Sequence, residues 1–168
     1  IAQNTFFFLI CGGYQLFGQY YETVDHQKIE GVQVGSYYSL TGKDKSRCIG
    51  NVVCDANLDG IHLRLVGFEN HGGQTMNVEH PLGRVIQGNG NAFDAGMEGY
   101  YDGHILGTYL HGPLLPKNGE LADFVLVKAL QKRHPEFTLQ DLAPMDNPWQ
   151  APARKAILDR YQLNDQPE

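Results

Sequence analysis

An apolar run that ends in a cysteine and two glycines constrains the fold of this chain most. Residues 6–10 contain no polar side chain, which is typical of a central strand buried on both faces of a sheet. Gly12 and Gly13 then allow a sharp turn of the backbone. Apolar and aromatic residues recur after the turn at near-helical spacing: Tyr14, Leu16, Phe17, Tyr20 and Tyr21. A strand, a tight turn and a helix form half of a βαβ unit, so the sequence predicts an α/β fold.

The composition fits one globular domain spanning residues 1–168. A hydrophobic fraction of 42% with 19% charged residues excludes a disordered, collagen-like or coiled-coil chain. The 13 Lys and Arg against 19 Asp and Glu give a net charge of −6 without a basic run, which argues against nucleic acid or anionic lipid as the partner. The longest apolar run is too short for membrane insertion. Three cysteines are an odd number, so we predict a reducing, cytoplasmic location without a disulfide framework.

The middle of the chain predicts short strands in an antiparallel or mixed layer. Residues 31–35, 50–54 and 61–66 cluster or alternate β-forming side chains between glycines. The segment from Asn57 to Gly60 is a favourable hairpin turn between two of these strands.

The last third predicts one more strand and two helices. A strand over 104–110 ends at His111, and the spacing of apolar residues predicts a helix over 120–133. A proline-bearing loop and a final helix over 152–163, with Ala156, Ile157 and Tyr161 on one face, complete a helical tail at about 134–168. We expect this tail to dock on the domain or on a partner.

Cys11 is the strongest candidate for chemistry. A side chain at a strand-to-helix turn is lifted out of the sheet, as in the nucleophile elbow. We expect the helix N-terminus to lower the pKa of the thiol, and the backbone N–H of Gly12 to form half of an oxyanion hole. A small buried cysteine in a structural turn is the alternative.

A cysteine nucleophile needs a base, and His111 is the best placed of seven histidines. If its strand lies beside the Cys11 strand, both side chains emerge at the carboxyl edge of the sheet, where open α/β sheets bind ligands. A strand-end histidine bonded to a loop is the alternative.

Two further groupings stay open at this level. Glu69 and His71 lie in a polar segment that reads as a turn presenting them to a substrate, or as a structural hairpin. A zinc site from Cys48, Cys54, His62 and His71 lacks any CxxC or HxxxH pair, so we predict no metal site. Phosphate-binding and dinucleotide-binding glycine loops are also absent from the sequence.

Five segments carry a resemblance to a known family. FLICGGYQLFG at 8–18 resembles the nucleophile segment of class I glutamine amidotransferases. GFENHGGQT at 67–75 and GTYLHGP at 107–113 resemble the CobB/CobQ-like subtype. RCIGN at 47–51 and LLPKN at 114–118 are most similar to the glutaminase subunits of lipid II isoglutaminyl synthase. The resemblance implies a flavodoxin-like, three-layer sandwich with a mostly parallel central sheet and a small antiparallel layer. This sequence begins at Ile1 rather than at Met, and the resemblance also implies further βα units before it.

The resemblance further implies roles for single residues. Cys11 would attack the side-chain amide of L-glutamine, and His111 would act as general base and then as acid. Gly12 N–H and the Gln15 side chain would hold the substrate, and Arg47 would bind its carboxylate. The resemblance implies no cofactor in this chain. It implies a Mur-ligase-like partner subunit (MurT) in a heterodimer, which holds ATP and Mg and uses the ammonia to amidate D-glutamate of lipid II.

The sequence departs from the pattern of many class I enzymes in two places. Leu9 replaces a glycine two residues before the nucleophile, and Gly112-Pro113 replaces the His-x-Glu acid, so the triad is a dyad or a partner completes it. Two other functions remain open. The chain could be a related amidotransferase that serves a different synthetase, such as the cobyrinate type, or a catalytically silent binding module.

Overall fold

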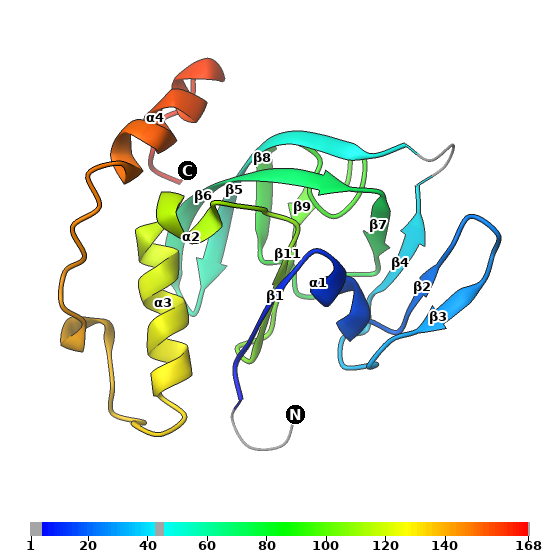
Figure 1. Cartoon of the computed structure of the whole chain (residues 1–168), viewed down its shortest axis with the longest axis horizontal. Coiled ribbons are helices and arrows are strands. Elements are labelled where there is room, and N and C mark those ends of the chain that lie inside the picture. Colours follow the sequence, from blue (N-terminus) through cyan, green and yellow to red (C-terminus); the bar gives the residue numbers. More distant parts are fainter. Residues whose placement is uncertain (1–4, 43–45, 168) are drawn as a thin grey trace.

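The computed structural model describes residues 5–42 and 46–167. Its helices are α1 (Gly12–Phe17), α2 (Leu114–Lys117), α3 (Gly119–Leu130), the 3-10 turn η2 (Leu139–Asp141) and α4 (Gln150–Arg160). Its strands fall into three sheets (Figure 1).

The first sheet has the order β1 (Phe7–Ile10), β11 (Ile105–Thr108), β10 (Tyr100–Tyr101). The second has the order β3 (Lys28–Glu30), β2 (Tyr20–Glu22), β4 (Tyr38–Thr41), β7 (Gly73–Met76). The third has the order β6 (Ile61–His71), β5 (Cys48–Leu58), β8 (Gly83–Gln87), β9 (Met97–Glu98).

Helices cover both faces of the first sheet, which confirms the α/β class. Leu106 of β11 packs in one core cluster with Leu121 and Phe124 of α3. Its neighbour Ile105 packs in the other cluster with Tyr14 of α1. Successive strand residues point to opposite faces, so α3 and α1 lie on opposite sides of this sheet. Figure 1 shows the two helices on either side of β1 and β11.

The strands of Cys11 and His111 lie side by side, as predicted. β1 pairs with β11 in parallel, with Ile10 opposite Thr108. The peptide N–H of Cys11 continues the ladder by donating to the Thr108 carbonyl at 2.9 Å. Cys11 and His111 therefore both follow the carboxyl ends of adjacent parallel strands.

The antiparallel part of the described chain is larger than the small layer we predicted. Only β1–β11 and β2–β4 pair in parallel among the described strands. From residue 48 to 98 the chain runs through antiparallel neighbours, which need no crossover helix. The predicted hairpin turn is confirmed, because β5 ends at Leu58 and β6 begins at Ile61, with Asp59 and Gly60 at φ 54° and 87°.

Three local predictions were wrong. β1 is half-buried along its length and, among the described residues, pairs with β11 alone, so it is not central here. The helix after Cys11 ends at Phe17, and Tyr20 and Tyr21 belong to β2. Residues 31–35 form no strand. A Cβ on Gly31 would lie 2.1 Å from the Gly18 carbonyl oxygen, so this glycine marks a close backbone approach.

The C-terminal helix docks on the domain through a buried arginine as well as through apolar contacts, since Ile157 of the predicted face packs against the cluster of Val53, Val66 and Leu158. Arg154 is buried, and its guanidinium donates to Asn118 Oδ1 at 2.6 Å, to the Arg64 carbonyl at 2.8 Å and to the Lys117 carbonyl at 3.2 Å. It also pairs with Asp165. Leu158 is the other buried residue of α4. Throughout residues 5–42 and 46–167, each helix is too short or too polar to cross a membrane.

Candidate active site

Cys11 occupies a strained position between β1 and α1. Its backbone has φ 51° and ψ −107°, in a region that residues with a side chain rarely adopt. The strand below it and the helix above it hold this conformation, as expected for a nucleophile elbow. The free thiol is partly exposed at the carboxyl edge of the first sheet.

The predicted lowering of the Cys11 pKa is wrong for this structure. Burial raises the pKa of the thiol, while the Gly12 backbone N–H and the positive charge of Arg47 oppose that rise without cancelling it. Helix α1 spans six residues, so few peptide dipoles act on the thiol. The resting thiol therefore favours its protonated form and needs a base to become a nucleophile.

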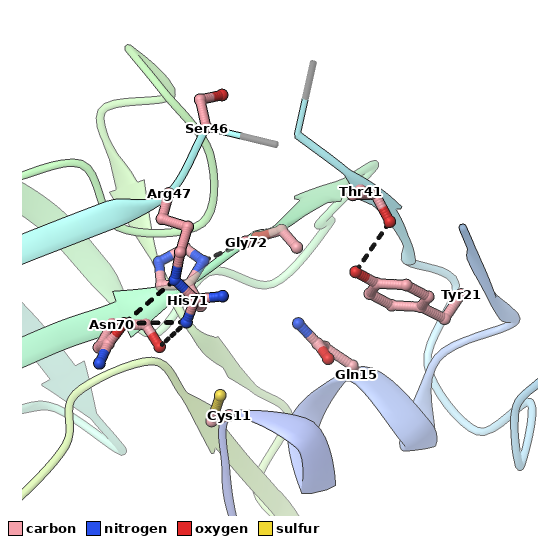
Figure 2. A pocket seen from close by; sticks show the side chains of 10 residues that line it. Cys11, Gln15, Tyr21, Thr41, Ser46, Arg47, Asn70, His71 and Gly72 are labelled. Atoms are coloured by element: carbon pink, nitrogen blue, oxygen red, sulfur yellow. Dashed lines mark hydrogen bonds between the residues drawn. The ribbon is translucent and has the colours of Figure 1, made fainter. Parts of the chain in front are cut away.

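A cavity of about 290 Å³ opens over Cys11 (Figure 2). Of the five predicted site residues, all in the described part of the chain, Cys11, Gln15 and Arg47 line it, whereas Gly12 and His111 do not. Its other lining residues are Tyr21, Thr41, Ser46, Asn70, His71, Gly72 and Gly73. Figure 2 shows Gln15 of α1 and Cys11, the residue before this helix, reaching into this space, with Arg47 opposite them.

A chain of hydrogen bonds fixes the Gln15 side chain in the cavity. Its amide nitrogen donates to the Tyr109 hydroxyl at 3.0 Å, and this hydroxyl lies 2.6 Å from Thr75 Oγ1. Gly73 makes room for the amide, because a Cβ there would lie 2.3 Å from Gln15 Nε2. The site therefore presents an oriented amide on the helix that begins at the cysteine.

Arg47 is the cation of the cavity. Its guanidinium donates to the side-chain oxygen of Asn70 at 2.8 Å and to the Asn70 carbonyl at 3.1 Å. These bonds hold the planar group over the same space as the Cys11 thiol (Figure 2). Because Nε also donates to Asn70 Oδ1 at 3.3 Å, Nε and Nη2 are both engaged and Nη1 remains to donate a charge-assisted hydrogen bond to a carboxylate.

A backbone carbonyl contacts the His111 ring at Nδ1. The Phe68 carbonyl of β6 accepts from the His111 peptide N–H at 2.7 Å, and it lies 3.1 Å from Nδ1. A carbonyl only accepts, so Nδ1 carries the proton of the neutral ring and Nε2 keeps its lone pair. His111 is thus in the tautomer that a general base requires.

Glu69 and His71 form neither the substrate-presenting turn nor the structural hairpin that the sequence left open, because β6 and the following strand β7 belong to different sheets. Both lie within β6, and both are buried. His71 lines the cavity and its ring stacks on Tyr109, with centroids 3.6 Å apart. The zinc set that we considered is not assembled among the described residues: Cys48 and His71 come together with Glu69, and Cys54 and His62 do not join them.

Sequence reasoning missed two supporting residues, Asn70 and Tyr109. Asn70 holds Arg47, and Tyr109 holds Gln15. Both lie inside the segments 67–75 and 107–113 that carried the resemblance, so those segments were the available signal. Their partners lie 23 and 94 residues away along the chain, a distance over which local patterns carry no information.

The comparison with known proteins decides the family. The profile of the CobB/CobQ-like glutamine amidotransferase domain matches residues 1–119, which is more than half of the chain. The chain belongs to the CobB/CobQ-like glutamine amidotransferase family. The elbow cysteine, the parallel β1–β11 pair and the arginine-bearing cavity described above all lie within the matched residues.

Relatives of two kinds match this chain. The chain is 38% identical over 151 residues to the lipid II isoglutaminyl synthase (glutamine-hydrolyzing) subunit GatD of Staphylococcus aureus (strain N315), covering 90% of this chain and 59% of that protein. It is also 38% identical over 128 residues to GatD of Streptococcus pneumoniae (strain ATCC BAA-255 / R6), covering 74% of this chain and 48% of that protein. A probable cobyric acid synthase of Methanocaldococcus jannaschii is 31% identical over 134 residues, which are 74% of this chain and 26% of that protein. The chain thus spans about half the length of the GatD relatives.

Proposed function

We propose that this chain is the glutamine-hydrolysing part of a glutamine amidotransferase, and that it works as the glutaminase subunit of a lipid II isoglutaminyl synthase. The single observation that carries the proposal is the Cys11 elbow, which opens into a cavity with an oriented amide from Gln15 and a cation from Arg47. A thiol, an amide and a guanidinium in one small cavity suit an amino acid with a side-chain amide. The identity to two GatD subunits supports the choice within the family.

The proposed reaction has two steps at Cys11. His111 Nε2 takes the thiol proton as sulfur attacks the side-chain carbonyl carbon of glutamine, and the Gly12 N–H faces the developing oxyanion. The C–N bond then breaks, His111 returns the proton to the leaving nitrogen, and ammonia and a thioester result. Water, deprotonated by the same histidine, cleaves the thioester to glutamate and restores the thiol.

Substrate recognition falls to Arg47 and Gln15 in this proposal. The guanidinium binds the α-carboxylate of glutamine through its positive charge and the Nη1 donors that Asn70 does not engage. The Gln15 amide, held by Tyr109, contacts the bound amino acid from the opposite wall of the cavity. The distance between these two groups selects for the length of the substrate.

We further propose that the ammonia is used by a Mur-ligase-like partner, MurT, in a heterodimer. That partner holds ATP and Mg, activates the D-glutamate carboxylate of the lipid II stem peptide in the cytoplasm, and forms D-isoglutamine during peptidoglycan synthesis. Support comes from the names of the two GatD relatives, which describe a glutamine-hydrolysing subunit of a synthase.

The experiment that tests this function is glutamate release from L-glutamine, with and without MurT and lipid II. We expect release that disappears in Cys11→Ala and His111→Ala, rises with the partner, and yields amidated lipid II. Cys54→Ala is the matched control, because Cys54 is a fully buried cysteine of the third sheet and does not line the cavity.

Other outcomes separate the rival functions. Cys11-dependent glutamate release without amidation of lipid II would refute the lipid II assignment and leave an amidotransferase that serves another synthetase. Folded protein that binds the partner but releases no glutamate under any condition would overturn the glutaminase proposal in favour of a binding module.

A further inference from the structure

A second group of reactive side chains lies behind the wall of the cavity, on the paired strands β5 and β6. Glu69 and His71 are two residues apart on β6, so they point to the same face of the sheet. Cys48 lies directly opposite His71 in the antiparallel register. The thiol sulfur, a carboxylate oxygen and an imidazole nitrogen of these three buried residues all lie within 4.8 Å of one another.

The orientation of the His71 ring is fixed from outside this group. Its Nδ1 lies 2.7 Å from the Gly73 carbonyl oxygen, which only accepts, so Nδ1 carries the proton of the neutral ring. Stacking on Tyr109 holds the ring plane. A histidine that donates one ring N–H to a backbone carbonyl while the other nitrogen faces a ligand is the usual arrangement at metal sites.

The other ring nitrogen has no hydrogen-bond partner. His71 is 2% exposed, and its Nε2 is an unpaired buried atom within the described structure. The nearest carboxylate oxygen, Glu69 Oε2, is 3.7 Å away, beyond a hydrogen bond. A buried lone pair beside a carboxylate is unfavourable, and either a proton or a metal cation between them relieves it.

Glu69 is held in place for such a role. Its Oε1 accepts from the Asn89 peptide N–H at 3.0 Å and from the Asn89 side chain at 2.6 Å, and its Oε2 accepts from the Gly90 N–H at 3.0 Å. A carboxylate fixed by this many donors keeps its charge in a buried position. The Gln74 amide nitrogen lies 3.5 Å from the Cys48 sulfur and orients the thiol.

We propose that Cys48, Glu69 and His71 form a binding site for a thiophilic divalent cation of the zinc class. Sulfur, imidazole nitrogen and carboxylate oxygen are the three ligand types of zinc sites, and the thiolate with the carboxylate balances the two positive charges. The thiol proton leaves to solvent on binding. Metal–ligand bonds of about 2.0–2.3 Å require the three atoms to draw together by about 1 Å.

The position of this site predicts what the cation does. His71 lines the cavity, so the cavity offers an entry path and room for water as a fourth ligand. The cation would link Cys48, the first residue of β5, to His71, the last residue of β6. Arg47 immediately precedes Cys48, so the bound cation would hold in place the end of β5 next to the guanidinium.

The test is a titration of the intact protein with Co²⁺, which reports thiolate ligation by absorption. It is carried out in Cys11→Ala, so that the exposed thiol of the cavity does not bind the metal. We expect one equivalent of Co²⁺ to give a thiolate-to-metal charge-transfer band that Zn²⁺ removes, and we expect Zn²⁺ to raise the melting temperature. No turnover is measured, so the result does not depend on the proposed glutaminase activity.

Variants in the same background identify the ligands. Cys48→Ser and His71→Gln should weaken Co²⁺ binding by at least about tenfold, and Cys54→Ser, the buried-cysteine control, should not. A folded Cys11→Ala protein without a charge-transfer band overturns the proposal, whether or not the further variants fold. A band that persists unchanged in Cys48→Ser overturns it as well, because the ligands then lie elsewhere.

Discussion

Replacing Arg154 by methionine tests whether one buried cation holds the C-terminal helix on the domain. Arg154→Met keeps the aliphatic stem and removes the guanidinium, whose side chain is 6% exposed. Two carbonyl oxygens, of Lys117 and Arg64, then lose this donor, at about 1.5–3 kcal/mol for each hydrogen bond to a charged group. Asn118 Oδ1 still accepts from the Val66 N–H at 2.9 Å, so its loss costs less.

The ion pair with Asp165 adds little to this sum. The Asp165 side chain is 55% exposed, so solvent screens the pair and its share is at most about 1 kcal/mol. The total loss is about 3 kcal/mol, which lowers the melting temperature of a domain of this size by roughly 6–12 °C.

Urea unfolding followed by circular dichroism measures the loss directly. Lys155→Met is the matched control on the same helix, because Lys155 is 72% exposed and pairs only with the neighbouring turn through Asp159. We expect the control to change the free energy of unfolding by no more than about 0.5 kcal/mol. If Arg154→Met loses no more stability than Lys155→Met, the tail is not held by its guanidinium and the reasoning is refuted.

Three further predictions concern the cavity and its wall. Burial holds the pKa of the Cys11 thiol above its ordinary value of 9.0, so iodoacetamide should alkylate it slowly at neutral pH and faster as the pH rises. Arg47→Gln should shift this increase in alkylation rate to higher pH, because the positive charge of Arg47 lowers the pKa of the thiol. A low alkylation rate that does not change with pH would contradict the prediction. Gly73→Ala places a methyl group 2.3 Å from Gln15 Nε2, so the Gln15 amide must move. We expect the KM for glutamine to rise by roughly fivefold, which corresponds to the loss of one hydrogen bond. An unchanged KM would exclude Gln15 from substrate binding. Burial raises the pKa of Glu69, but hydrogen bonds from its neighbours bring the pKa below its ordinary value of 4.5. The charged carboxylate therefore stabilises the folded protein above pH 4.5, and this stabilisation is lost as the pH falls through the lower pKa of the folded state, so the free energies of unfolding of the wild type and Glu69→Gln should converge below pH 4.5. Parallel acid unfolding curves would show that Glu69 does not supply this stabilisation.

The parts of the fold that the sequence predicted are those set by neighbours along the chain. The strand before Cys11, the turn at Asp59-Gly60 and the helix near 120–133 each follow from local spacing and turn chemistry. The placement of Cys11 beside the His111 strand was inferred from the parallel-sheet rule, and the register of β1 with β11 confirms it.

The parts that it did not predict depend on distant partners. Arg154 reads as one more cation of an exposed helix, and its burial follows from acceptors 36 and 90 residues away. The apolar run of β1 gave no sign of how many strands would pair with it. Glu69 and His71 read as a polar turn because their acceptors and donors, Gly73 and the 89–90 backbone, become visible only when β6 extends to residue 71.

In the proposed reaction, the electrostatics of the cavity favour transfer of the Cys11 proton to His111 during attack over a thiolate that forms before substrate binds. Arg47 is the charge that opposes the effect of burial on the Cys11 pKa, and in the proposed reaction the same guanidinium binds the substrate carboxylate. Once glutamine neutralises that charge, the thiol holds its proton more firmly than in the empty cavity. Attack then requires a base that accepts the proton as the C–S bond forms, and His111 Nε2 has the free lone pair.

This argument predicts a clear separation between two measurements. His111→Gln should abolish glutaminase turnover, while the alkylation rate of Cys11 in the empty site at high pH stays near that of the wild type. Added glutamate, which carries the same α-carboxylate, should slow alkylation at a fixed pH in the wild type and not in Arg47→Gln. If His111→Gln keeps its turnover, the thiolate exists before substrate binds, and the opposition between burial and Arg47 does not govern this site.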